Sequence, residues 1–511
     1  MRADATDLGV HLSPWLEAER GRSRRPRLGD EASADVAVIG GGITGLTTAL
    51  RLAEAGRAVV LVDQNAIGSG TTGHSSAKVT SQHAITYAPL LARHGQDAIR
   101  AYAGANEEAK EAIADLAGPG GIDCDFRRRD AWVYAAGDSD RALIEAEARA
   151  AKRAGLPAKL SEAVPLPFPT AGGLVFANQA EFDPQRYVLG LAERFEAAGG
   201  TIFEDTRATG VSDGSPVRVE TEHGVVVADH AVVATLIPFL DRGVFFARAF
   251  PSRSYCVTAA VADPIPEAML ITATAPMRSL RAIRHGDREL LMVGGESHDT
   301  GTTEAELERY RRLTEFAHLH WEVESIEHHW SSQDYSAADS VPYVGPLHPF
   351  TDHLWIATGM KKWGITNGTV AAAIISDAIQ GRRHQAADLF SSTRLPTREV
   401  PKLAVENAKV PLHFFGDRLR SRGSRSIDDL APDEGAVVSA GGKKVAGYRD
   451  EAGGLHAVSA RCTHLYCQVN WNGAERTWDC PCHGSRYDAR GKVIQGPATR
   501  DLVPADVGSG S

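Results

Sequence analysis

A glycine-rich turn between two secondary-structure patterns constrains the fold of this chain most strongly. Residues 36–39 are apolar, residues 40–45 read Gly-Gly-Gly-Ile-Thr-Gly, and a helical pattern follows to residue 55. A second apolar run, residues 59–62, ends at Asp63, 23 residues after Gly40. In such a strand–turn–helix–strand unit, backbone N–H groups can approach a pyrophosphate while the acid accepts from a ribose hydroxyl. The pattern predicts a dinucleotide site in a Rossmann-type α/β domain.

A second feature is a group of cysteines and histidines near the end of the chain. Four of the six cysteines lie in two motifs, Cys-Thr-His-Leu-Tyr-Cys at 462–467 and Cys-Pro-Cys-His at 480–483. Two such Cys and His pairs on facing loops suit a [2Fe–2S] cluster with two cysteines on one iron and two histidines on the other. A structural zinc site is the alternative. Zinc explains neither the two additional cysteines nor the spacing within each pair.

Composition narrows the function classes. The 511 residues carry a net charge of −10, with only short basic clusters, so we expect no nucleic-acid partner. The longest apolar stretches, near 231–240 and 370–379, are shorter than the ~18 residues of a membrane span, so none is expected. The twin arginine Arg24–Arg25 is not followed by an apolar segment. Residues 1–34 are therefore interpreted as an uncleaved leader of a cytoplasmic protein.

The remaining patterns suggest how the chain is divided. A strand pattern at 228–234 and a strand, glycine-rich turn (359–368) and helix (369–379) indicate that the nucleotide domain is discontinuous. Residues 386–431 lack a clear period and are rich in Arg, Ser and Pro, which predicts a linker. Short strands and glycine turns from about 435 predict a compact all-β module.

The stretches 36–45, 69–74, 233–235 and 359–368 carry a family resemblance. With them, residues 34–385 resemble the FAD-dependent oxidoreductases of the D-amino-acid oxidase and glycine oxidase superfamily. The resemblance implies a glycine-oxidase-like fold within 35–385, with FAD-binding pieces at about 35–80, 185–240 and 335–385. An α+β substrate domain would comprise about 81–184 and 241–334. The resemblance further implies these FAD-binding residues: Gly40, Gly42, Gly45, Asp63, Thr71, Thr72, Ala234, Gly359, Lys362, Trp363, Gly364 and Thr366.

Two candidate catalytic residues follow from the same resemblance. Lys78 matches a position at which the sarcosine-oxidase branch sets a cation against the flavin, and His74 lies between Lys78 and the glycine stretch. A solvated lysine and a hydrogen-bonding histidine are the alternative interpretation.

Departures from that branch are informative about the substrate and the oxidant. The branch holds a substrate carboxylate with two cations, which align with Ser81 and Thr366 here. A small amino acid anchored in that way is therefore not expected. The lysine that activates dioxygen in that branch aligns with Met292. We accordingly expect slow reaction of the reduced protein with dioxygen.

The two cysteine motifs, with Gly496-Pro497-Ala498, make residues 432–511 resemble a Rieske [2Fe–2S] domain. The resemblance implies that Cys462 and Cys480 bind one iron, that His464 and His483 bind the other, and that Cys467 and Cys482 form a disulfide. Ser485 and Tyr487 match hydroxyls that donate to sulfur in the cytochrome-bc type. Such donors favour the upper part of the roughly −150 to +300 mV Rieske range.

The combined motifs favour a FAD-dependent dehydrogenase. It would oxidise a small amine or N-alkyl substrate by hydride transfer to flavin N5 and pass electrons through the cluster to an unknown external acceptor. One alternative is a flavin and Rieske electron-transfer component serving a separate redox partner. A Rieske oxygenase would need a mononuclear iron held by two histidines and a carboxylate, for which residues 318–329 offer the nearest group. A redox-sensing binding protein is the fourth hypothesis.

Overall fold

The computed structural model describes residues 8–302, 305–395, 403–404, 407, 426–440 and 443–505. Most of the linker predicted at 386–431 lies outside these residues, as do the two ends of the chain at 1–7 and 506–511. Among the described residues, no helix has the length and apolarity needed to cross a membrane.

The glycine-rich turn lies in the first of two large sheets. β1 (Glu31–Ile39) is flanked in parallel by β2 (Val59–Val62) and β10 (Val225–Val233). The order of the main strands is β16-β17-β10-β1-β2-β7. β9 also pairs with β10, and β8 pairs with β9. The other strands are β7 (Thr201–Phe203), β8 (Ala208–Val211), β9 (Val217–Thr221), β16 (Tyr343–Pro346) and β17 (Leu354–Thr358). The sheet thus unites three distant parts of the chain, as the strand patterns predicted.

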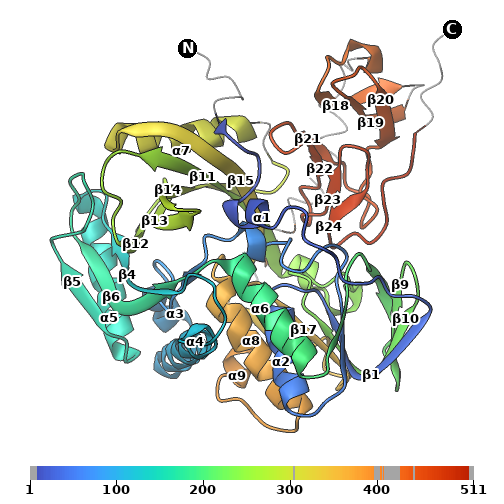
Figure 1. Cartoon of the computed structure of the whole chain (residues 1–511), viewed down its shortest axis with the longest axis horizontal. Helices are drawn as coiled ribbons and strands as arrows, with labels where there is room; N and C mark the ends of the chain where they lie inside the picture. The colour runs from blue at the N-terminus through green and yellow to red at the C-terminus, as the bar shows by residue number, and fades with distance from the viewer. Residues whose placement is uncertain are drawn as a thin grey trace.

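Three helices pack together beside this sheet (Figure 1): α2 (Ile43–Glu54), α6 (Pro184–Ala197) and α8 (Gly364–Ile379). α8 begins at Gly364, whereas the sequence predicted a turn as far as Gly368. A Cβ atom at Gly368 would lie 2.5 Å from Thr44 Oγ1 of α2. This glycine therefore permits close packing of two helices rather than a turn.

The second sheet is largely antiparallel and has the order β15-β11-β14-β13-β12-β4-β6-β3, with β5 beside β6. The long strand β11 (Ala249–Val261) lies next to the edge and pairs with both β14 (Arg288–Asp299) and β15 (Val323–Ala337). The other strands are β3 (Lys78–Val79), β4 (Arg127–Tyr134), β5 (Ala158–Ser161), β6 (Gly173–Glu181), β12 (Ala268–Thr272) and β13 (Arg278–His285). The helices of this part are α3 (Tyr87–His94), α4 (Gln96–Ala117), α5 (Arg141–Arg153) and α7 (Glu306–His320). Figure 1 shows this sheet on the opposite side of the molecule from β1 and β10.

The C-terminal part is all-β and has its own core around Trp478 and Tyr487. One sheet contains β18 (Glu434–Ala440), β19 (Lys443–Arg449) and β20 (Leu455–Ser459). The other contains β21 (Asn470–Asn472), β22 (Thr477–Asp479), β23 (Arg486–Asp488) and β24 (Val493–Gln495). Figure 1 shows β21–β24 next to the rest of the molecule and β18–β20 farther out.

The described part of the predicted leader is folded against the rest of the chain. It includes the short helix α1 (Pro14–Ala18), whose Trp15 is buried. Ser13 Oγ donates a 2.5 Å hydrogen bond to the backbone oxygen of Gly73. Arg24 and Arg25 of the twin arginine form ion pairs with Asp205 and Glu196. These contacts join the segment to the glycine-rich part of the molecule.

Candidate functional site: a cavity and a cysteine–histidine cluster

A cavity of about 820 Å³ is lined by residues from both large sheets and from the C-terminal module. Its volume is in the range of ligand and cofactor sites. Most of the predicted FAD-binding residues line it: Gly40, Gly42, Asp63, Thr71, Thr72, Ala234, Lys362, Trp363 and Gly364. The other three, Gly45, Gly359 and Thr366, are not among the lining residues. Thr366 Oγ1 donates a 3.1 Å bond to Thr80 O.

The glycine turn requires its glycines for steric reasons. Gly40 has φ of +106°, and a Cβ atom there would lie 2.7 Å from Ala234 O. A Cβ atom on Gly45 would lie 1.9 Å from Gly40 O. At the cavity edge, Ile43 N, in the first turn of α2, donates to Thr72 Oγ1 at 3.1 Å. Because the glycines of this turn carry no side chains, the backbone at the start of α2 can approach a pyrophosphate in the cavity.

Asp63 lies at the end of β2, beside this turn. Its carboxylate accepts hydrogen bonds from Gly41 N at 2.6 Å and Asn65 N at 2.8 Å. Burial raises the pKa of Asp63 to about 6, although these bonds oppose the shift. The carboxylate is thus held rigidly where the Rossmann pattern places a ribose acceptor.

The start of α8 forms another edge of the cavity. Lys361 and Lys362 both have left-handed backbones, with φ of +54° and +68°. Asp334 on β15 accepts a hydrogen bond from the backbone N–H of Lys362. Strained backbone held by a buried carboxylate is typical of functional sites. Sequence patterns did not single out Asp334, because its partner lies 28 residues away in the chain.

The two candidate catalytic residues also line the cavity. Lys78 Nζ donates a 2.8 Å hydrogen bond to Leu270 O, and burial lowers the pKa of Lys78 to about 7. His74 Nδ1 lies 2.9 Å from Gly70 O, and burial lowers its pKa as well. Trp330 Nε1 donates to His74 O at 3.0 Å. Both side chains therefore face the cavity at positions fixed by backbone contacts.

Hydroxyl groups cover one wall of the cavity. Ser252, Ser254 and Cys256 alternate along β11 and line the space. Their neighbours across the sheet include Ser332 opposite Ser254 and Gly294 opposite Cys256. This wall combines small side chains with hydrogen-bonding capacity. The sequence did not reveal it, since single serines in strands carry no distinctive signal.

Met292 and Ser81, two of the three positions that depart from the sarcosine-oxidase branch, do not line the cavity. Met292 is fully buried, opposite Arg281 in the β13–β14 pair, and is not among the lining residues. Ser81 Oγ donates a 2.5 Å bond to Glu107 Oε1 and is also buried. Neither residue supplies a charge to the cavity.

The histidines proposed for an oxygenase iron have other contacts. His328 Nε2 lies 2.7 Å from Glu17 Oε2, and its Nδ1 lies 2.8 Å from Thr258 Oγ1. His329 Nδ1 lies 3.0 Å from Leu8 O. Neither histidine lines the cavity as the structure describes it.

The C-terminal cysteines and histidines meet at the end of the β21–β24 sheet. Cys462 and Cys480 are buried and free, and the rings of His464 and His483 have centroids 5.1 Å apart. His483 Nδ1 is buried and has no hydrogen-bond partner among the described residues. Burial lowers the pKa of His483 to about 3, which leaves its imidazole neutral. An unpaired neutral nitrogen beside two free thiols fits an iron–sulfur site.

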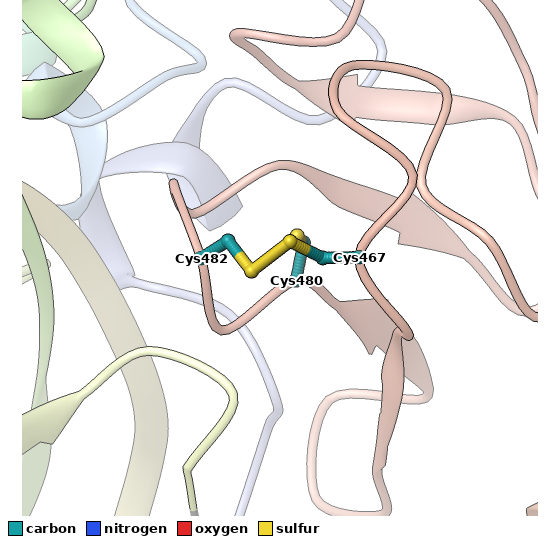
Figure 2. Close-up of side chains that lie close together, drawn as sticks. All are labelled: Cys467, Cys480 and Cys482. Carbon is teal, nitrogen blue, oxygen red and sulfur yellow. A yellow bond between two sulfur atoms is a disulfide. The ribbon is translucent and has the colours of Figure 1, made fainter. Parts of the chain in front are cut away.

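Cys467 and Cys482 form the predicted disulfide, with Cα atoms 6.5 Å apart. Figure 2 shows this bond beside the side chain of Cys480. The disulfide removes two of the four clustered cysteines from the possible metal ligands. The remaining donors are Cys462, Cys480 and the two histidines.

The hydroxyl groups of Tyr487 and Ser485 lie close to the free thiol of Cys462. Tyr487 Oη lies 3.1 Å from Cys462 Sγ. Ser485 Oγ accepts a 3.0 Å hydrogen bond from Ala498 N, in the loop that contains Gly496 and Pro497. Hydrogen bonds from Cys480 and, despite burial, from Tyr487 lower the pKa of the Cys462 thiol to about 6.

The cysteine–histidine loops lie directly against the second large sheet. Tyr335 Oη donates a 2.8 Å hydrogen bond to His483 O, and Gln333 Nε2 donates one of 2.8 Å to Gly484 O. Gln333 also accepts, at its backbone oxygen, a 3.1 Å bond from Thr71 Oγ1. Gln333 therefore lines the cavity and also contacts the loop that contains His483.

The C-terminal module also covers part of the cavity. Gln64 Nε2 donates a 3.1 Å bond to Ile494 O, and the residues around β24 contribute to the lining. These lining residues are Ile494, Gln495, Gly496, Ala498 and Thr499.

Comparison with known families identifies the two parts. Residues 35–378 match the family model of FAD dependent oxidoreductases, abbreviated DAO. The chain belongs to this family. Residues 424–505 of the oxidoreductase match the model of the Rieske [2Fe-2S] domain. The predicted fold class and the two cofactors, FAD and a [2Fe–2S] cluster, are thereby confirmed.

Individual relatives agree with this assignment. A Bacillus subtilis (strain 168) protein named for a Rieske 2Fe-2S centre, YhfW, is 35% identical over 94% of this chain and 95% of its own length. The cytochrome b6-f complex iron-sulfur subunit of Synechococcus elongatus is 54% identical over 57 residues, which are 11% of this chain and 32% of that subunit. The oxidoreductase and Rieske parts therefore occur together in at least one other protein.

Solved structures support the fold of the oxidoreductase part. Glycine oxidase from Geobacillus kaustophilus superposes with a TM-score of 0.58 at 19% identity, covering 71% of this chain and 99% of the enzyme. L-proline dehydrogenase from P. horikoshii gives a TM-score of 0.58 at 17% identity, covering 72% of this chain and 98% of the enzyme.

Proposed function

We propose that this oxidoreductase is a dehydrogenase of a small amine or N-alkyl compound. Its electrons would leave through the Rieske cluster of the same chain to an external acceptor. Bound FAD supplies a two-electron acceptor, whereas a [2Fe–2S] cluster carries one electron at a time. In this proposal Cys462, Cys480, His464 and His483 hold the cluster, and the residues named above hold FAD in the cavity.

The observation that carries the proposal is the position of Gln333. Its backbone oxygen accepts a bond from Thr71 in the cavity wall, and its side chain donates to Gly484, next to His483. A proposed cofactor residue and a proposed cluster ligand are thus linked through one side chain and short backbone segments. Such proximity supports electron transfer within the chain rather than to a separate Rieske protein.

The cavity suits an amine better than an amino acid anchored by its carboxylate. Ser81 and Thr366 bring no positive charge to it, and the β11 wall offers hydroxyl groups. Burial lowers the pKa of Lys362 to about 8 and that of Lys78 to about 7. At neutral pH Lys362 is still mostly protonated, whereas Lys78 is only partly protonated, and the smaller charge of Lys78 reduces repulsion of a cationic amine. The wall serines would orient the substrate, and water would be excluded by the module around β24.

The names of relatives also support a reaction at a C–N bond. The gamma-glutamylputrescine oxidoreductase of Escherichia coli (strain K12) is 29% identical over 213 residues, which are 40% of this chain and 50% of that enzyme. Glycine oxidase and L-proline dehydrogenase share the fold. Because their names cover primary and secondary amines, both kinds belong in a substrate screen.

Anaerobic reduction of the FAD- and iron-loaded protein tests the proposal. A panel of amines, N-methyl amino acids and NAD(P)H is added, and optical and EPR spectra are recorded. We expect an amine to bleach the flavin absorbance and to produce the EPR signal of a reduced Rieske cluster, with slow reoxidation by air. Reduction by NAD(P)H alone would contradict the proposal and favour an electron-transfer component.

A Cys480→Ser variant is the matched control, because it removes one proposed iron ligand and leaves the cavity intact. In this variant the same amine should still bleach the flavin, but no Rieske signal should form and a one-electron acceptor should no longer be reduced. Continued reduction of that acceptor would place the electron exit elsewhere.

A further inference from the structure

The histidine side of the cluster site lies against a short segment of the oxidoreductase part. This segment follows β10 and contains two 3₁₀ turns, Asp241–Gly243 and Phe245–Ala247. His464 Nε2 lies 2.8 Å from Asp241 Oδ1. The ring of Phe246 makes edge contacts with both histidines, at centroid distances of 5.2 Å to His464 and 4.9 Å to His483.

The backbone of this segment is strained in a way that fixes these contacts. Val244 lies between the two turns with φ of +53°, an uncommon conformation for a β-branched residue. Arg248 donates a 2.9 Å hydrogen bond to Gly243 O, and its guanidinium lies 4.4 Å from the centroid of the Phe245 ring. Arg242 donates a 2.7 Å bond to Val211 O. Strain retained against such restraints is typical of functional positions.

The contact also indicates which nitrogen of His464 would hold a metal. Because Nε2 is directed at the Asp241 carboxylate, Nδ1 is the nitrogen available to a metal. The unpartnered nitrogen of His483 is likewise Nδ1. A histidine that binds a metal through Nδ1 carries its proton on Nε2, so His464 would donate to Asp241.

We propose that Asp241 is a positioning residue of the cluster, which holds the outer nitrogen of His464 and lowers the reduction potential of the cluster. This inference rests on the ligand set in the proposed function. A carboxylate that accepts from a ligating histidine makes the ligand more basic and stabilises the oxidised iron. Its negative charge, 2.8 Å from His464 Nε2, also opposes the added electron. Asp241 thus acts against Ser485 and Tyr487, which would raise the potential.

The carboxylate comes from the oxidoreductase part, so the effect depends on docking of the two parts. If docking favours the oxidised cluster by some factor, reduction must weaken docking by the same factor. The Rieske domain would therefore have a lower potential in contact with Asp241 than when separated from it. The contact would link the redox state of the cluster to the strength of the interface.

The test is a reduction potential, measured by mediator titration with EPR detection on the iron-loaded full chain at one fixed pH. We expect Asp241→Asn to raise the reduced-to-oxidised ratio at a fixed potential about tenfold, equivalent to ~59 mV for one electron. Asp241→Ser should do the same, and Asp241→Glu should stay nearer the wild type. Asp241 has a side-chain exposure of 58%, so these substitutions leave the core intact.

Two carboxylates serve as controls. Asp501→Asn removes an ion pair of 3.3 Å to Arg207 across the same interface but touches no cluster ligand. Asp352→Asn removes the same charge from an exposed site, where its partner is His353. Both should leave the potential near that of the wild type. An unchanged potential in Asp241→Asn, or an equal rise in either control, would overturn the inference.

The readout needs neither substrate nor acceptor, so it separates this inference from the proposed function. Loss of the Rieske EPR signal in the wild type would contradict the ligand set. A normal signal with an unchanged potential in both Asp241→Asn and Asp241→Ser would contradict only the contribution of Asp241.

Discussion

The hydroxyl group of Tyr335 donates a 2.8 Å hydrogen bond to the backbone oxygen of His483, a proposed ligand of the cluster. Tyr335 lies on β15 of the oxidoreductase part, and both residues are buried. The cluster loop is therefore part of a packed interface and not an exposed tip.

Gly484 lies in close contact with the oxidoreductase part at this interface. Its φ is +76°, and a Cβ atom would lie 2.7 Å from both Pro251 Cβ and Tyr335 Oη. We expect Gly484→Ala to separate the two parts and to slow electron transfer from flavin to cluster at least about tenfold, because transfer falls steeply with distance. Stopped-flow absorbance after anaerobic substrate addition measures both steps, and flavin reduction itself should be unchanged.

Gly453→Ala is the matched control for this substitution. Gly453 also has a left-handed backbone, with φ of +87°, but no atom lies within 4 Å of the added Cβ. Both substitutions place a side chain on a left-handed backbone, which costs about 1–2 kcal/mol. Only Gly484→Ala also creates a steric clash. Equal electron-transfer rates in the two variants, with equal iron content, would show that the contact at Gly484 is not needed.

Glu475 anchors the Rieske domain in a buried polar site. It accepts a 2.6 Å bond from Tyr310 Oη and lies 3.5 Å from Arg253 and 3.4 Å from His11. Burial raises the pKa of Glu475, but the hydrogen bond with His11 and the charge of Arg253 outweigh it and hold the pKa well below its ordinary value. The ionised form therefore contributes stability above pH about 4.5, which is lost as the pH falls through the lower folded-state pKa.

We expect Glu475→Gln to destabilise the protein by about 3–5 kcal/mol near pH 7, because it leaves buried cations without their partner. The difference from the wild type should shrink as the pH falls below 4.5. Thermal unfolding across this pH range measures it. Glu451→Gln breaks an exposed pair with Arg476 and should cost less than about 1 kcal/mol. A similar loss in both variants would argue against a special contribution of Glu475.

Lys78 is expected to give the protein a second pH dependence. Burial lowers its pKa from 10.5 to about 7. The unfolded chain therefore binds more protons than the folded chain between these values, and stability should rise with pH by at most about 1.4 kcal/mol per unit. Lys78→Met should remove this rise. Unfolding followed by flavin fluorescence from pH 6 to 9 tests it.

Lys159→Met in β5 is the control, because Lys159 is exposed. It should retain the rise seen in the wild type. If Lys78→Met shows the same pH dependence as the wild type, the lysine is charged throughout this range, and the lowered pKa is wrong.

The disulfide is expected to stabilise the Rieske domain without holding iron. Cys467 and Cys482 are separated by 15 residues, for which loop closure gives about 3 kcal/mol. The double variant Cys467→Ser/Cys482→Ser should lose that stability and keep its iron at low temperature. Heating with EPR detection measures the loss. Cys124→Ala, at an isolated buried cysteine, should leave the thermal stability of the cluster unchanged. Complete loss of iron at low temperature would instead make the disulfide necessary for cluster assembly.

The sequence determined the local parts of both sites because their constraints are short-range. The turn at 40–45 requires glycine for contacts within a few residues, and Asp63 follows directly from the second strand of the unit. The spacing of Cys462, Cys467, Cys480 and Cys482 is likewise a local property of two loops. These patterns were sufficient to predict a dinucleotide site and a [2Fe–2S] cluster, and FAD was predicted from the family resemblance that the stretches 69–74, 233–235 and 359–368 also carry.

Only the tertiary structure decided which residues lie between the two sites. Gln333, Tyr335 and Asp241 are single polar residues in strands and turns, and nothing in their neighbouring sequence distinguishes them. They gain significance because Gln333 contacts Gly484, Tyr335 contacts His483 and Asp241 contacts His464 across 148 to 223 positions of the chain. Such contacts depend on how two separately folded surfaces pack, and local propensity and periodicity carry no information about that packing.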